Sequence, residues 1–300
     1  MELVQLCMKK RGIRFFAKIP KEFENTTVSS NYKSYTTKER FLSELARREN
    51  EYDMILITAH GAEDKIIVPI TQFDLYRQEH PERSNDKYRT YISLEDTRFF
   101  KNDFVFAVSC LTAQEFGPAV VENGVIAYLG YDVIIENLFN VSDVCMSSRV
   151  RELYETVVKG IFVKELVQAV TKFLNDMQNV LMLKQWFAFQ LEKRLIEFFS
   201  MSAEEVYATY GIGINKDIWN RNRQKLQIQQ LNFLGEINQH LIIIGDPKYI
   251  SLYGIENGCK IDKQAYDRLK AVSFDNKDYE KKFKDELEHL IEVQDENGLY

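Results

Sequence analysis

A cysteine and a histidine stand at the positions of this sequence where chemistry is easiest to place. Cys110 follows the apolar run Phe104 to Val108, which is short and rich in β-branched and aromatic residues and predicts a buried parallel strand. Thr112 and Glu115 then have the spacing of a capping box, which predicts a helix over residues 113–122. We expect the amino end of that helix to favour a thiolate at Cys110.

His60 has a similar setting. It stands with Gly61 at the end of an apolar strand that we expect to begin at Tyr52. Ligands of open α/β sheets bind at the carboxyl ends of the strands, so thiol and imidazole are expected at one edge. Taken alone, the histidine is equally a structural residue and the cysteine more often a buried small hydrophobe. Together they indicate nucleophilic catalysis, in which a thiolate attacks a carbonyl and the imidazole moves the proton.

The segments ITAHG and FAVSC, which place His60 and Cys110 50 positions apart, resemble the caspase-like cysteine peptidase clan. Three further segments are similar to its gingipain and CHAT branches: GVIAYLGY at 124–131, HLIIIGDPKYISL at 240–252 and, more weakly, KGIFVKELVQAV at 159–170. The sequence departs from the animal caspases at Val108 to Thr112, where the Gln-Ala-Cys-x-Gly motif is absent, so cleavage after Asp is not implied.

The resemblance implies an α/β three-layer sandwich with a mainly parallel sheet and the activity of a cysteine endopeptidase. Cys110 would be the nucleophile, His60 the acid and base, and the Gly61 amide a donor to the oxyanion, without metal or cofactor. It implies a protein substrate and, in prokaryotic relatives, a role in defence or signalling. Relatives that cut after Arg or Lys line the first pocket with an acid, and Asp132 follows strand 124–131 directly; its alternative role is to cap a turn. A catalytically silent binding or signalling module is the alternative function.

The amino-acid composition limits the classes of partner and site that we expect for this chain. The chain has 300 residues, a net charge of −6 and 45% hydrophobic content, which indicates a globular protein and argues against nucleic acid as a direct partner. The four cysteines show neither zinc nor disulfide spacing, and no apolar run is long enough for a membrane span. We therefore expect a cytoplasmic protein without a metal site and without a membrane partner.

The domain organisation follows from where the strand signals stop. We expect one α/β domain over residues 1–254, with a helical segment at about 142–238, and a helical tail at 255–300. The minimal fold needs neither addition, so we expect one of them to hold the site latent or to receive an activating or inhibitory protein partner.

The remaining pattern predicts a first strand at Leu3 to Met8, an amphipathic helix from Thr37, an apolar run at Ile66 to Ile70 and a polar loop at Tyr76 to Arg89. Further elements are expected as a helix at 93–100, a capped short helix from Ser202 to Gly211, an exposed helix at 220–230, a last strand at 240–244 and an apolar stripe at Phe283, Leu287, Leu290 and Ile291.

Overall fold

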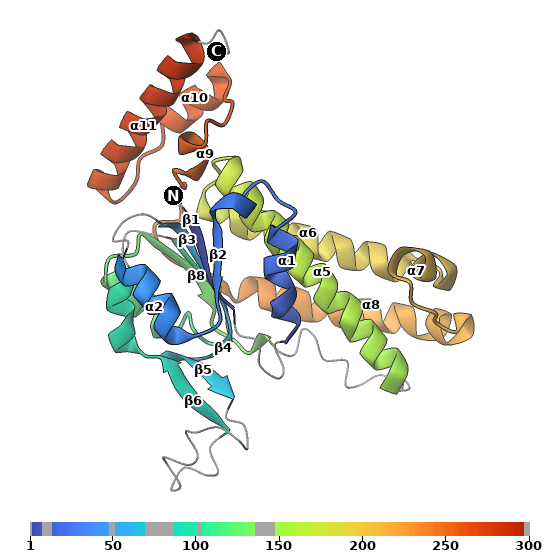
Figure 1. Cartoon of the computed structure of the whole chain (residues 1–300). Coiled ribbons are helices and arrows are strands. Elements are labelled where there is room, and N and C mark those ends of the chain that lie inside the picture. The colour runs from blue at the N-terminus through green and yellow to red at the C-terminus, as the bar shows by residue number, and fades with distance from the viewer. Residues whose placement is uncertain are drawn as a thin grey trace, which may run out of the picture.

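A six-stranded sheet forms the centre of the chain (Figure 1). The computed structural model describes residues 2–7, 14–47, 52–69, 87–100, 104–135 and 148–296. The strand order is β2-β1-β3-β7-β8-β9; the first five strands run parallel and β9 is antiparallel to β8. The fold is thus α/β with a mainly parallel sheet, as expected. The strands are β1 (Glu2–Cys7), β2 (Tyr32–Tyr35), β3 (Tyr52–Thr58), β7 (Phe104–Val108), β8 (Ala127–Tyr131) and β9 (Leu241–Gly245).

Helices cover both faces of the sheet, which explains why β3, β7 and β8 are buried along their whole length. On one face, the ring of Phe104 lies 5.1 Å from Phe173 of α5 (Ser148–Asn175), and the ring of Phe106 lies 6.1 Å from Phe187 of α6 (Val180–Ser200). The short helix α1 (Ile19–Phe23) packs on α5, and η1 (Arg14–Lys18) and η2 (Ser29–Asn31) lie before β2.

The opposite face is covered by α2 (Lys38–Arg47), the 3-10 helix η4 (Leu94–Phe99) and α4 (Phe116–Glu122). The amphipathic helix predicted from Thr37 is confirmed, with Phe41, Leu42 and Leu45 buried. The helix predicted at 93–100 is this 3-10 turn, closed by a capping box between Ser93 and Asp96.

A second, three-stranded antiparallel sheet follows β3 at its carboxyl end. It consists of β4 (His60–Ala62), β5 (Lys65–Pro69) and β6 (Tyr88–Ile92). One strand from Tyr52 through Gly61 is therefore wrong: the chain bends at Ala59, and His60 begins a new strand. Of the predicted polar loop, residues 76–86 lie outside the described part of the chain.

The helical segment expected at 142–238 is confirmed from residue 148 onward. It contains α5, α6, α7 (Ala203–Tyr210) and α8 (Lys216–Gln239), and α6 packs against both α5 and α8. The capping box of Ser202 and Glu205 starts α7, and Gly211, with a φ of 70°, ends it. The helix predicted at 220–230 is part of α8. Within residues 220–230, Leu226 and Gln230 are buried and the other side chains are more exposed.

The tail expected at 255–300 contains α10 (Lys263–Lys270) and α11 (Lys277–Glu296), and α9 (Tyr253–Glu256) spans its expected start. Its predicted stripe is confirmed: Phe283, Leu287 and Leu290 are buried, and they share a small core with Met177 and Ile250 of the preceding chain. The tail lies at the amino-terminal end of the sheet, and β4 to β6 lie at the opposite end (Figure 1).

The join between tail and sheet is polar. The hydroxyl of Ser251 donates to the carboxylate of Asp53, the second residue of β3, at 2.7 Å, and the hydroxyl of Tyr249 donates to the Asp53 carbonyl at 3.2 Å. The Asp53 side chain is buried, and this burial raises its pKa to about 7 even though the Ser251 hydrogen bond acts in the opposite direction.

Across the described ranges, every helix is too short or too polar to cross a lipid bilayer.

Asp53 is expected to make the fold less stable as the pH rises. The unfolded chain releases this proton near its ordinary pKa of 3.8, whereas the folded chain keeps it up to about 7. Raising the pH through this window therefore favours the unfolded state. Urea unfolding at pH 5 and at pH 8 measures this effect. The unfolding free energy of the parent should fall between these pH values by at least about 1 kcal/mol more than that of Asp53→Asn. The exposed control Asp217→Asn should keep the parent's slope, and an equal slope in Asp53→Asn would show that the buried carboxyl does not titrate in this way.

Candidate active site

Parallel pairing of β3 and β7 brings the predicted residues to one edge of the sheet. Thr58 and Val108, the last residues of the two strands, are direct partners in the register. His60 and Cys110 each follow two positions later, so both leave the sheet side by side. After β1, the chain adds β2 on one side of it and β3 on the other, so the strand order reverses between β1 and β3. Ligands of open α/β folds bind beside such a switch point.

The contact between the two segments is made at Gly61. A Cβ atom at this residue would lie 2.3 Å from the carbonyl oxygen of Cys110, 2.4 Å from the hydroxyl oxygen of Ser109 and 2.7 Å from a methyl group of Thr112. Only a residue without a side chain fits this close approach. The His60-Gly61 segment therefore lies directly against the turn that carries Cys110.

The turn after Cys110 is held by the segment after β8. Leu111 has a φ of 61°, a left-handed conformation that is uncommon for a branched side chain, and its amide donates to the carbonyl of Val133 at 3.2 Å. The amide of Ala113 donates to the carbonyl of Tyr131 at 3.0 Å. Unusual backbone of this kind persists where the surroundings fix it, and it is concentrated at functional sites.

The two side chains themselves are mostly enclosed. His60 is 6% exposed and Cys110 is 9% exposed. The ring of Tyr88, from β6, meets the His60 ring edge to face at 5.4 Å between centroids. Tyr131 lies under the turn; burial raises the pKa of its phenol, and the nearby Cys110 raises it further.

The helix start predicted beside Cys110 is wrong. The side chain of Thr112 donates to the carbonyl of Ser109, and α4 begins at Phe116 without a side-chain cap. The amides of Glu115 and Phe116 donate instead to the carbonyl of Glu63 in the β4–β5 turn. Tertiary hydrogen bonds thus replace the capping box, and residues 111–115 separate the sulfur from the helix.

Asp132 lies at the same edge, in the segment after β8. Its carboxylate is 2.8 Å from Nδ1 of His240, and its amide donates to the His240 carbonyl at 3.2 Å. A pocket of about 380 Å³ is lined by Asp132 and His240 together with Leu111, Val133, Ile134, Phe233 and Glu236. Sequence reasoning did not select Leu111, Glu236 or His240. Leu111 reaches the pocket beside Val133, which accepts its amide, whereas Glu236 and His240 reach it because β9 pairs antiparallel to β8.

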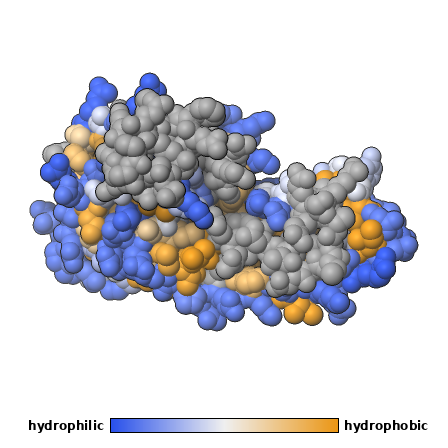
Figure 2. All heavy atoms as spheres, turned by 90° about the horizontal axis from the view of Figure 1, so that it is seen from below, coloured by the Kyte–Doolittle hydropathy of each residue, from blue (hydrophilic) through white to orange (hydrophobic). Residues whose placement is uncertain are grey.

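Figure 2 views the molecule from the end where β4 to β6 lie, and both hydrophobic and hydrophilic residues are exposed on that face.

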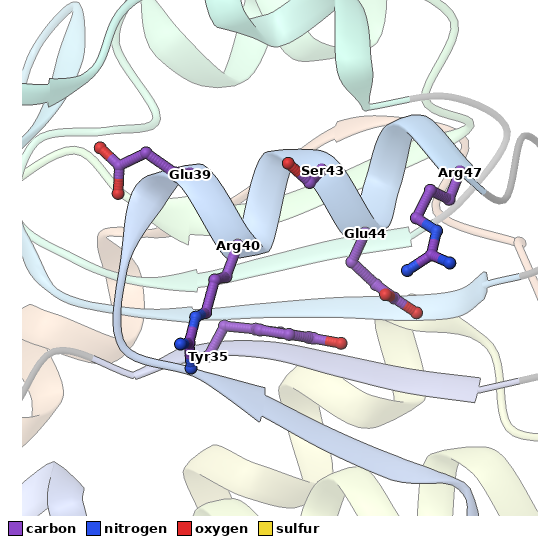
Figure 3. A pocket seen from close by; sticks show the side chains of 6 residues that line it. All are labelled: Tyr35, Glu39, Arg40, Ser43, Glu44 and Arg47. Carbon is purple, nitrogen blue, oxygen red and sulfur yellow. The ribbon is translucent and has the colours of Figure 1, made fainter.

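A second pocket lies away from His60 and Cys110, along α2 beside the edge strand β2 (Figure 3). It is lined by Tyr35, Glu39, Arg40, Ser43, Glu44 and Arg47, and its charges are of both signs. Within the described ranges, no three His, Cys, Asp or Glu side chains gather as a metal site would require.

The sequence matches no protein-family model, and no curated protein matches it either.

The close approach at Gly61 predicts the effect of a single methyl group. Gly61→Ala would drive a Cβ into backbone and side-chain atoms of the Cys110 turn, so the unfolding free energy should fall by about 1–3 kcal/mol. Gly160→Ala is the matched control, because nothing lies within 4 Å of its added Cβ, and it should stabilise α5 by about 0.5–1 kcal/mol. Chemical denaturation measures both. A Gly61→Ala protein as stable as the parent would contradict the packing described here.

Proposed function

We propose that the chain is a cysteine endopeptidase of the caspase-like clan, with Cys110 as nucleophile and His60 as general acid and base. The observation that carries this proposal is the packing of Gly61 against the Cys110 turn, which sets a histidine and a cysteine beside each other at the carboxyl edge of the sheet. The left-handed Leu111 next to the thiol supports it.

The thiolate depends on the imidazole. An unperturbed thiol has a pKa near 8.5, so it is mostly protonated at neutral pH. α4 begins only at Phe116, so residues 111–115 separate its first turn from Cys110 in the chain. In the proposed mechanism, the His60 imidazolium stabilises the negative charge on the Cys110 sulfur.

The reaction follows the ordinary course for such a pair. The proton of the Cys110 thiol passes to His60, and the resulting thiolate attacks the carbonyl carbon of the scissile peptide. As the carbon–nitrogen bond breaks, His60 gives that proton to the leaving amine, and a thioester remains on Cys110. Water, deprotonated by His60, then hydrolyses the thioester and releases the carboxyl product.

The developing oxyanion needs donors, and the proposal assigns the Gly61 amide as one of them. Ala62 and Lys65 pair across the two-residue turn of the β4–β5 hairpin, and hydrogen-bonded and non-hydrogen-bonded pairs alternate along an antiparallel ladder. We expect Gly61 to fall in a non-hydrogen-bonded pair, with its N–H directed away from β5. Such a donor contributes on the order of 3 kcal/mol in other hydrolases.

Regulation by a protein partner is part of the proposal, and the helical segment is the better candidate for it. The tail is anchored through Ser251 to the start of β3, at the end of the sheet opposite Cys110. The last turns of α8 instead supply Phe233 and Glu236 to the pocket next to Leu111. A partner that binds the helical segment therefore acts on the site more directly than one that binds the tail. The proposed substrate is one partner protein, in a prokaryotic defence or signalling system.

Substitution of the pair tests the activity. In a peptide-library cleavage assay, Cys110→Ala should abolish cleavage, and His60→Ala should reduce it by at least about 100-fold, the scale of general acid–base catalysis. Cys259→Ala should cleave like the parent, since burial raises the pKa of that thiol to about 11 and it lies in the core that the tail helices share.

Circular dichroism should show that all three variants remain folded. A folded Cys110→Ala protein that still cleaves would exclude the dyad. A parent chain that cleaves nothing and whose Cys110 resists peptide electrophiles would favour the silent binding module instead.

A further inference from the structure

The pocket of about 380 Å³ between α2 and the edge strand β2, which we call the α2–β2 groove, has a charged wall. The apolar side chains of α2 are buried, so its polar residues form the opposite, exposed side of the helix. In Figure 3, Arg40, Glu44 and Arg47 point from α2 toward the side on which Tyr35 of β2 lies, whereas Glu39 extends away from them. Two cations and one anion therefore face the groove from a single helix.

The anion is already engaged, and the two arginines are not. Nζ of Lys33, on β2, lies 3.3 Å from the Glu44 carboxylate, and the hydroxyl of Tyr52 donates to the same oxygen at 3.1 Å. Arg40 and Arg47 are exposed, and among the described residues neither guanidinium forms an ion pair or a hydrogen bond. The groove thus offers positive charge to a ligand, although the chain as a whole is acidic with a net charge of −6.

The other wall of the groove is the edge of the sheet. In the described part of the chain, β1 is the strand that pairs with β2, and the outer edge of β2 carries no further strand. Every second residue of such an edge directs its N–H and C=O groups outward, which allows an extended peptide to add a strand. A segment that paired there would run alongside α2 and within reach of its arginines.

The spacing of the arginines favours an extended segment over a single small anion. Arg40 and Arg47 are seven residues apart, which separates their Cα atoms by about 10 Å along the helix. In an extended segment, alternate side chains lie on one face about 7 Å apart, and the long arginine side chains accommodate the difference. Two acidic side chains of the segment then each meet one guanidinium, which binds carboxylates with two parallel hydrogen bonds.

We propose that the α2–β2 groove binds an acidic, extended segment of a partner protein. The segment adds a strand to the outer edge of β2 and places its acidic side chains against Arg40 and Arg47. This groove is separate from His60 and Cys110, so the proposal goes beyond the proposed function and holds whether or not the chain is a peptidase.

Fluorescence anisotropy with a fluorescein-labelled peptide of alternating glutamate and valine tests the charge complementarity. The full-length Cys110→Ala chain is used, so that the probe stays intact. Exchanging the glutamates for glutamines should weaken binding at least about tenfold, as should the double substitution Arg40→Gln and Arg47→Gln, because each removes charged hydrogen bonds. Arg268→Gln, at an exposed arginine of α10, is the matched control and should leave binding unchanged.

Two further peptides, N-methylated at every glutamate or at every valine, test the strand addition. Alternate residues of a strand direct their N–H groups to opposite edges, so one peptide should lose at least about tenfold in affinity and the other should not. Equal binding of the glutamate and glutamine peptides, or parent-like binding by the double arginine variant, would overturn the acidic ligand. Equal behaviour of the two N-methylated peptides would overturn the addition of a strand to β2.

Discussion

The site depends on one constraint, the pairing of β3 with β7 as parallel neighbours in a register that ends both strands together. That pairing delivers the His60 and Cys110 segments to the same edge, and the missing side chain of Gly61 lets them touch. Aromatic packing on one face of the sheet supports this register, since Phe104 and Phe106 of β7 contact Phe173 of α5 and Phe187 of α6. A slip of one residue would reverse which side chains of β7 face these helices.

The two additions to the sheet act at opposite ends of it. The tail is joined to the start of β3 through the buried Asp53 and Ser251, where it builds a small core of its own. Helix α8 ends beside the carboxyl edge, where His240 and Asp132 connect it to the turn after Cys110. The end of α8 therefore forms part of the pocket wall, whereas the tail is joined to the sheet at the end away from Cys110.

Strands that are buried on both faces were predictable, because they appear in the sequence as continuous apolar runs. The run Phe104 to Val108, for example, has the same bounds as β7. The capping box of Ser202 and Glu205 was also predictable, since both of its reciprocal hydrogen bonds form within the first turn of α7. The similar pattern of Thr112 and Glu115 failed because Glu63, far away in sequence, supplies the carbonyl that the amides of Glu115 and Phe116 need. Glu236 and His240 gave no local signal, as their place in the pocket follows from antiparallel pairing of β9.

The dyad is tested most directly by the pH dependence of Cys110 alkylation with iodoacetamide, followed by peptide mapping in the parent and in His60→Ala. Because α4 begins only at Phe116, the proposed pairing with the His60 imidazole should be what depresses the pKa of the Cys110 thiol. The parent's rate should therefore rise with an inflection well below about 8.5, and that of His60→Ala should rise near or above this value. The same inflection in both proteins would contradict the pairing of His60 with Cys110.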